Sequence, residues 1–466
     1  MALWLFSFYT FYMHYFTSHN PYTYITMAQY PVVSAGMIEQ TLQTANTAQR
    51  QWKNKDVAER AQAVLQLAQL IQHNHEQLAQ LATVEMGKTL FESRLEVLKC
   101  STACEYYAAN TQRIVAPTTV THIDGRKVTT LLEPLGVVLG IFPWNFPYWQ
   151  IIRSAIPVIM GGNCMIVKPA PNTPQCAIAL QDLFNQCGLQ EIVQTVFATN
   201  EQVAEMIGDA RIKACTLTGS EKAGAAVASK AAFHIKKSVL ELGGSDPFIV
   251  LADANMDLVM ENALSARFQN NGQSCIASKR YIVHLDVINE FTDRLKAEMA
   301  KLIVGDPMLP QTNIGPLARL DLKTKLSHQV SESLQAGAKI AYQAFEPNTE
   351  DCFYPPTILT YIPKNSIAYS EELFGPVLSL YSVASAEEAI ALANDTEFGL
   401  GASIWSRNTE YAQTLATQIE SGQVFINAVT RSNAAFPFGG IKKSGYGREM
   451  GEEGLKEFCT IKTIWV

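Results

Sequence analysis

The sequence predicts an α/β protein in which short strands alternate with helices in two lobes. Short β-branched apolar runs each end at a turn-forming loop, and amphipathic stretches with a helical period lie between them. This alternation implies right-handed crossovers and parallel sheets. At 466 residues the chain also exceeds what one hydrophobic core normally supports, so we expect at least two lobes.

Composition and charge narrow the class of protein. Apolar residues make up 48% and charged residues 17% of the chain, which is typical of a compact enzyme or binding protein. The net charge is −7 and no long run of Lys or Arg is present, so we expect no nucleic-acid partner. Nine cysteines without a CxxC pair or metal-ligand spacing indicate a reducing cytoplasm and no metal site.

The N-terminus begins with the aromatic-rich stretch MALWLFSFYTFYMHYF. It lacks the basic region and cleavage site of a signal peptide, and it is shorter than the about 20 apolar residues that cross a bilayer. We therefore expect residues 1–18 to be a non-native or disordered extension, and we expect no membrane association.

The first predicted elements are helices, in residues 56–109. Asp56 and Glu59 have the spacing of a capping box, and Gly87 is placed to end a second helix. An alternating segment follows, with predicted strands at 137–141, 164–167 and 214–217 and predicted helices at 149–160, 174–187 and 202–207. Ligands of a parallel sheet bind at the carboxyl ends of its strands.

The loops at those ends are PWNFP, KPAPN and TGSEKAG. Gly219 and Ser220 begin a helix, whose N-terminus suits a phosphate but is equally explained as an ordinary cap. No GxGxxG fingerprint is present, so these residues alone are weak evidence of a nucleotide site.

A second alternating segment predicts the second lobe. Its strands are expected at 246–251, 280–285 and 422–427, and its helices at 256–269 and 287–302. Two further strand-like segments, 126–135 and 457–466, lie outside both lobes. Such strands need a partner sheet, which pairing across an oligomer would supply.

Two residues are candidates for a catalytic role. Cys275 lies among Asn, Gln and Ser, as expected of a partly exposed nucleophile, although a structural thiol is about equally consistent. Glu241 ends an apolar strand before Gly243 and Gly244, where a carboxylate is either a general base or a turn acceptor. Neither residue alone decides between these alternatives.

Taken together, the motifs carry a resemblance. The ordered set PWNFP, KPA, TGS, ELGG, GQSC, EELFGPV and FGGIKKSGYGRE is similar to the NAD(P)-dependent aldehyde dehydrogenase superfamily, and further stretches most resemble its bacterial succinate-semialdehyde dehydrogenases. The resemblance runs from about residue 30 to the C-terminus. It implies a Rossmann-type cofactor domain (19–115 and 135–243), an α/β catalytic domain (244–448) and β oligomerisation strands (116–134 and 449–466) of a homodimer or homotetramer.

The resemblance also implies the catalytic roles. Cys275 would attack the aldehyde carbon as a thiolate, and Asn145 with the backbone N–H of Cys275 would stabilise the oxyanion. After hydride transfer to the nicotinamide, Glu241 would activate the water that hydrolyses the thioester.

The expected cofactor contacts follow the same motifs. Lys168 would hold the adenosine ribose, Ser220 the pyrophosphate and Glu372 the nicotinamide ribose, and the other positions expected around the cofactor are Trp144, Gly219, Leu242 and Phe374. NAD-preferring relatives commonly carry a Glu where this chain has Pro171, which can neither accept the ribose hydroxyls nor repel a 2′-phosphate. We therefore expect NADP to be used at least comparably with NAD.

The substrate contacts match the succinate-semialdehyde enzymes only in part. Arg153 stands at the position of a carboxylate-binding arginine, but a second such arginine is replaced by Gln269. Arg431 and Ser432 are candidates to compensate for it.

Other functions remain open at this point. They are oxidation of another small aldehyde, CoA-dependent acylation, a non-catalytic role, and a cysteine hydrolase, for which His234 and His284 offer no matching motif.

Overall fold

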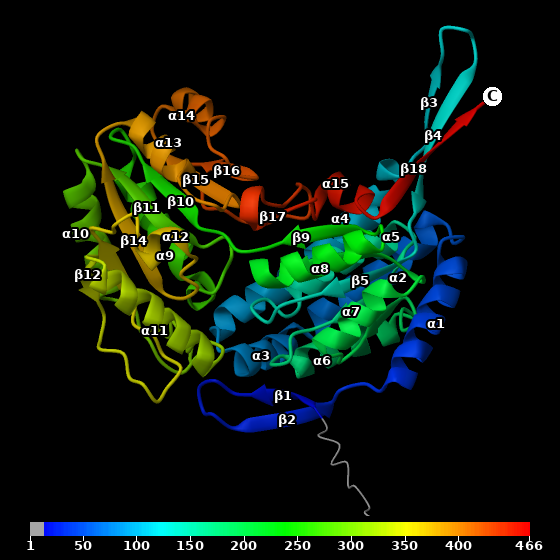
Figure 1. Cartoon of the computed structure of the whole chain (residues 1–466), viewed down its shortest axis with the longest axis horizontal. Helices are drawn as coiled ribbons and strands as arrows, with labels where there is room; N and C mark the ends of the chain where they lie inside the picture. Colours follow the sequence, from blue (N-terminus) through cyan, green and yellow to red (C-terminus); the bar gives the residue numbers. More distant parts are fainter. Residues whose placement is uncertain (1–13) are drawn as a thin grey trace, which may run out of the picture.

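The computed structural model describes residues 14–466, which form two lobes side by side with a β arm projecting from the first lobe (Figure 1). The first lobe is built on a six-stranded sheet of order β17-β9-β8-β5-β6-β7, in which only β17 is antiparallel to its neighbour. Its strands are β5 (Val137–Ile141), β6 (Cys164–Lys168), β7 (Val193–Thr195), β8 (Ile212–Thr218), β9 (Lys237–Glu241) and β17 (Gly445–Tyr446).

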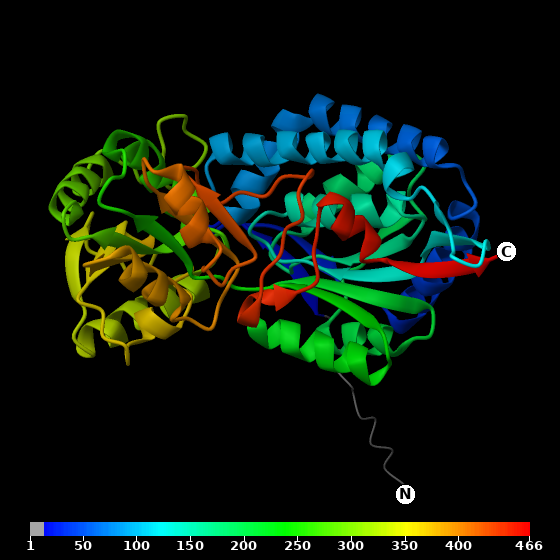
Figure 2. The same cartoon turned by 90° about the horizontal axis from the view of Figure 1, so that it is seen from above.

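Helices cover both faces of this sheet. Figure 2 shows α2 and α4 on one side and α8 on the other. The helices of the lobe are α1 (Ala35–Trp52), α2 (Val57–His73), α3 (His75–Met86), α4 (Leu90–Ile114), α5 (Trp149–Met160), α6 (Pro174–Gln186), α7 (Asn200–Gly208), α8 (Glu221–Phe233) and α15 (Gly451–Lys456). The predicted capping box and helix end are confirmed, since Asp56 N–H donates to Glu59 Oε2 at 3.0 Å and Gly87 is left-handed at φ 86°.

The second lobe contains a seven-stranded sheet of order β12-β13-β14-β11-β10-β15-β16, in which only β12 and β13 pair antiparallel. Its strands are β10 (Asp246–Val250), β11 (Ser278–His284), β12 (Lys339–Gln343), β13 (Thr357–Thr360), β14 (Val377–Val383), β15 (Gly401–Trp405) and β16 (Gln423–Ile426). Its helices are α9 (Met256–Phe268), η1 (Gln269–Gly272), α10 (Ile288–Met299), α11 (Leu320–Gln335), α12 (Ile367–Ser370), α13 (Ala386–Asn394), α14 (Thr409–Ala416) and η2 (Lys442–Ser444).

The predicted strands outside the lobes pair with one another within the chain, so their partner sheet does not require an oligomer. β18 (Cys459–Trp465), β4 (Lys127–Pro134) and β3 (Thr118–Thr121) form an antiparallel three-stranded sheet. This sheet is the projecting arm of Figure 1.

The structure corrects the expected bounds of the N-terminal extension. β1 (Tyr15–His19) pairs with β2 (Thr26–Pro31), and Phe16 is buried with its ring centroid 4.9 Å from that of Phe197. The expected disordered extension therefore does not include residues 15–18, because burial of Phe16 and the β1–β2 ladder fix them. The rest of that prediction, residues 1–13, lies outside the described residues. Within residues 14–466, no helix combines the length and apolar character that a bilayer span requires.

Candidate active site

Cys275 follows a tight left-handed turn. Asn270, Asn271 and Gly272 have φ values of 56°, 57° and 74°. Asn and Gly are the residues that adopt this backbone conformation most readily. A side chain at Gly272 would also lie 2.5 Å from the main chain of Gly375. The sequence NNG therefore shapes the turn that presents the thiol.

The amide side chains before Cys275 are buried. Asn270 Nδ2 donates to the main-chain oxygen of Asn145 at 2.8 Å, and Asn145 Nδ2 donates to that of Gln273 at 3.1 Å. Asn271 Nδ2 donates to Gly87 O at 2.9 Å. These bonds tie the loop that carries the nucleophile to the loop that carries the expected oxyanion donor.

Cys275 is partly exposed, and its surroundings shift the pKa of its thiol in opposite directions. Burial raises its pKa to about 11, while Arg153 and then Lys279 oppose that rise. Lys279 Nζ also donates to the main-chain oxygens of Ser274 and Cys275, at 2.7 Å each, and forms an ion pair with Glu372 at 2.8 Å. Lys279 therefore both orients the nucleophile loop and favours the thiolate.

Two cavities meet at Cys275. The first has a volume of about 640 Å³ and lies at the carboxyl ends of β5, β8 and β9. Most of the expected cofactor residues line it, namely Trp144, Gly219, Ser220, Leu242, Glu372 and Phe374. Asn145 and Cys275 line it as well. Trp144 and Phe374 are in contact, with ring centroids 5.9 Å apart and planes at 90°.

The first cavity fits a dinucleotide. Ser220 caps α8 by accepting from Ala223 N–H, so the positive end of the helix dipole faces the cavity. Gly243 leaves room beside Glu372, since a Cβ there would lie 2.7 Å from Glu372 Oε2.

Two expected cofactor residues lie beyond the lining of the first cavity. Lys168 is buried at the end of β6, with Nζ 5.5 Å from the Phe16 ring centroid, and burial lowers its pKa. Lys168 forms no ion pair with the described residues, so its charge is available to an anion. Pro171 is exposed on the loop after β6.

The second cavity has a volume of about 520 Å³ and lies on the other side of Cys275. All four expected substrate residues line it: Arg153, Gln269, Arg431 and Ser432. Gln150, on α5, lines both cavities.

Glu241, the expected general base, lies deeper in the structure than Cys275. It is buried at the end of β9 but lines neither cavity, and a Cβ on Gly439 would lie 2.9 Å from its Oε1. Burial and then the nearby Glu449 raise the pKa of Glu241 well above its usual range, while Arg153 opposes that rise. Asn145 and Cys275 therefore share the first cavity, and the buried Glu241 carboxyl group lies within electrostatic reach of Cys275 as well as of Arg153 and Glu449.

Arg153 lines the second cavity but its charge is already compensated. Its Nε lies 2.6 Å from Glu449 Oε2, and the two side chains are 2% and 1% exposed. Arg153 also donates to Thr218 Oγ1 at 3.2 Å and stacks 5.0 Å from the Phe438 ring centroid. The guanidinium is therefore not a free cation for a substrate carboxylate.

The aldehyde dehydrogenase family model matches residues 12–464. The chain belongs to this family.

Relatives within the family are similar over nearly the whole chain. The chain is 44% identical over 448 residues to a probable succinate-semialdehyde dehydrogenase [NADP(+)] of Synechocystis sp., covering 96% of this chain and 98% of that protein. It is 41% identical over 450 residues, with the same coverage, to succinate-semialdehyde dehydrogenase [NADP(+)] 1 of Mycobacterium tuberculosis. The crystal structure of the Streptococcus pyogenes succinic semialdehyde dehydrogenase with NADP+ superposes with a TM-score of 0.94 at 34% identity, covering 97% of this chain and 99% of that one.

Three further residues near the site of this aldehyde dehydrogenase could not be recognised from its sequence alone. Lys279 lies at the start of β11, where no motif distinguishes it from an edge lysine. Glu449 stands inside the quoted motif FGGIKKSGYGRE, but its pairing with Arg153 needs the fold. Lys99 lies on α4, whose spacing indicates only an amphipathic scaffold helix.

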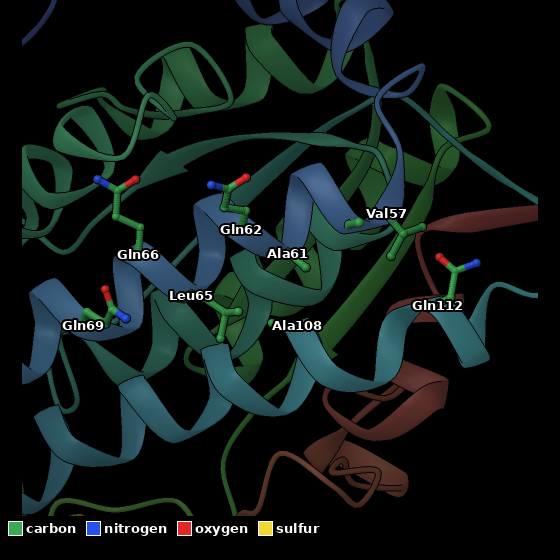
Figure 3. A pocket seen from close by; sticks show the side chains of 9 residues that line it. Val57, Ala61, Gln62, Leu65, Gln66, Gln69, Ala108 and Gln112 are labelled. Atoms are coloured by element: carbon green, nitrogen blue, oxygen red, sulfur yellow. The ribbon is translucent and has the colours of Figure 1, made fainter.

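A further hollow of about 780 Å³ lies between α2 and α4 (Figure 3). It is lined by apolar side chains and glutamines, and it contains no titratable, nucleophilic or metal-ligating side chain. Among residues 14–466, no cluster of His, Cys, Asp and Glu could hold a metal ion.

Proposed function

We propose that this aldehyde dehydrogenase oxidises succinate semialdehyde to succinate with NADP+, and that NAD+ also serves. The observation that carries the proposal is the position of Cys275 between a dinucleotide-sized cleft and a second cavity lined by cationic side chains. The relatives at 41–44% identity are named as NADP+-dependent succinate-semialdehyde dehydrogenases, which supports the same choice.

Catalysis begins at the thiol. The Cys275 thiolate attacks the aldehyde carbon, and the resulting oxyanion accepts hydrogen bonds from the Cys275 N–H and from Asn145 Nδ2. Asn145 already donates one amide hydrogen to Gln273 O, so its second hydrogen remains for the oxyanion. The two loops are held together before substrate arrives, which lowers the cost of organising the hole.

When bound, the cofactor supplies the hydride acceptor. Trp144, Ser220, Leu242, Glu372 and Phe374 would hold it in the first cavity. Buried Lys168 would pair with a 2′-phosphate, and Pro171 places no negative charge against that phosphate.

Hydrolysis of the thioester requires a base. Because Glu241 is buried and lines neither cavity, its carboxyl group must move toward Cys275 to deprotonate a water. The presence of this carboxyl group favours release of a free acid over transfer to the thiol of coenzyme A.

Assembly and location are part of the proposal. The edge strands of the arm sheet, β18 and β3, can each pair with a strand of a second copy of the chain. We therefore propose a homodimer or homotetramer. The described cysteines are all unpaired, which favours the cytoplasm.

The test is steady-state kinetics with succinate semialdehyde and butanal, each with NADP+ and NAD+. The proposal requires kcat/KM to be highest for succinate semialdehyde with NADP+, with succinate formed in the absence of coenzyme A. A preference for butanal, or a hundredfold preference for NAD+, would contradict it.

A further inference from the structure

We propose that Lys99 binds the carboxylate of the substrate and, together with Ser432, sets the specificity of the site for an aldehyde acid. This inference rests on the proposed oxidation of succinate semialdehyde. It identifies the cationic side chain that binds the carboxylate of that substrate. The geometry assigns the role to a side chain of α4, far in sequence from the other substrate residues.

The position of Lys99 places its ammonium group at the second cavity. Lys99 and Cys275 both line that cavity. Lys99 Nζ lies 2.5 Å from Ser432 Oγ and 4.2 Å from the Trp149 ring centroid. Ser432 Oγ in turn accepts from Trp149 Nε1 at 3.1 Å, so the hydroxyl is fixed beside the ammonium.

The charge of Lys99 is uncompensated, unlike those of its neighbours. Arg153 is paired with Glu449, and Glu96, one turn away on α4, is paired with Lys88. No ion pair joins Lys99 to a carboxylate within residues 14–466. A half-buried ammonium whose close partners among the described residues are a hydroxyl and an indole ring is a site for an external anion.

The electrostatics of the cavity agree with that geometry. Burial and then Arg153 lower the pKa of Lys99 to about 8, while Cys100, Glu96 and Cys275 oppose the shift. A carboxylate bound beside Nζ would favour the charged form. The effect of Cys275 on this pKa also places Lys99 within electrostatic reach of the reacting sulfur.

The substrate carries an aldehyde and a carboxylate, and Cys275 and Lys99 line the same cavity. In succinate semialdehyde two methylene groups separate the aldehyde from the carboxylate. With the aldehyde carbon at Cys275, the carboxylate lies farther along the cavity that Lys99 and Ser432 line. Arg431 lines the cavity too, but it is exposed, and water screens its charge.

The experiment compares two substrates of similar length in Lys99→Met and Lys99→Gln. The measured quantity is the kcat/KM for succinate semialdehyde divided by that for butanal, with NADP+. Loss of one charged hydrogen bond should lower this ratio on the order of 10- to 100-fold, mainly through KM for succinate semialdehyde. Lys99→Arg, which keeps the positive charge, should restore most of the ratio.

Lys55→Met is the matched control. Lys55 is an exposed lysine whose Nζ lies 5.3 Å from the Trp52 ring centroid, outside both cavities, so its replacement removes a charge and an aromatic contact without touching the site. Its ratio should equal that of the wild type.

The outcomes separate the two proposals. A wild-type enzyme that does not favour succinate semialdehyde over butanal overturns the proposed substrate, and the role of Lys99 with it. A wild-type preference that survives in both Lys99 variants overturns the role of Lys99 alone. Equal losses for both aldehydes would mean a structural role, and a larger loss of the ratio in Arg431→Met would assign the carboxylate to Arg431; either result contradicts the inference.

Discussion

Arg153 Nε lies 2.6 Å from Glu449 Oε2 in a buried ion pair behind Cys275. The pair holds a positive charge close to the thiol and to Glu241 without leaving it free in the substrate cavity. Arg153 is the first of the groups that oppose the rise in the pKa of Cys275, and it also opposes the rise in that of Glu241. We infer that Arg153 is a positioning residue for the reacting groups.

Replacing Arg153 by Met should therefore impair oxidation of charged and uncharged aldehydes alike. The uncompensated Glu449 should also lower the free energy of unfolding by about 3–5 kcal/mol. Kinetics with succinate semialdehyde and butanal, and urea unfolding, measure the two effects. The double variant Arg153→Met/Glu449→Leu should recover most of the stability. A rise in KM for succinate semialdehyde alone would instead return Arg153 to carboxylate binding.

The reactivity of Cys275 should depend steeply on pH in the cofactor-free enzyme. Its pKa is raised to about 11, so the thiolate is a small fraction at neutral pH. Because only the thiolate reacts, alkylation by iodoacetamide should accelerate roughly tenfold per pH unit between pH 7 and 9. Peptide mapping separates Cys275 from Cys459, the other partly exposed cysteine among the described residues. A plateau below pH 9 would refute this account of the thiol.

The turn before Cys275 should not tolerate a side chain at Gly272. Gly272→Ala places a Cβ 2.5 Å from the main chain of Gly375 and strains a φ of +74°. We expect a loss of about 1–3 kcal/mol in unfolding free energy and a large fall in kcat, because the nucleophile loop must move. Gly125→Ala is the matched control, since its φ is +87° but no atom lies within 4 Å of the added Cβ. Equal kcat losses in both variants would disprove the packing argument.

Pro171 should set the balance between the two cofactors. Pro171→Glu introduces a negative charge near the expected 2′-phosphate, so kcat/KM with NADP+ should fall at least about tenfold relative to that with NAD+. Pro171→Gln adds a similar volume without charge and should change the ratio far less. If the two variants behave alike, charge at this position does not discriminate the cofactors.

The periodic elements were predictable from the sequence because their signals are local. The strands at 137–141 and 164–167 are short β-branched runs bounded by turn residues, and Gly87 ends its helix as its conformational freedom suggests. The arm strands were recognised as strands, but their mutual pairing joins segments more than 300 residues apart, which no local pattern encodes.

The site was predictable in its residues but not in its arrangement. The sequence places amides around Cys275 but does not show that the fold buries them, where they hold two loops together. The pKa of Glu241 depends on Glu449 and Arg153, which come from other parts of the chain. Lys99 belongs to no sequence motif. Its role can be inferred only from the fold, which places α4 beside Ser432.

The central claim is that Cys275 carries the acyl group and Glu241 releases it. Glu241→Gln should form the thioester but hydrolyse it on the order of a hundredfold or more slowly. We predict that mass spectrometry of this variant, quenched after mixing with succinate semialdehyde and NADP+, will find one succinyl group on the peptide that contains Cys275. Its absence there, or an equal yield on Cys275→Ser, would contradict the account.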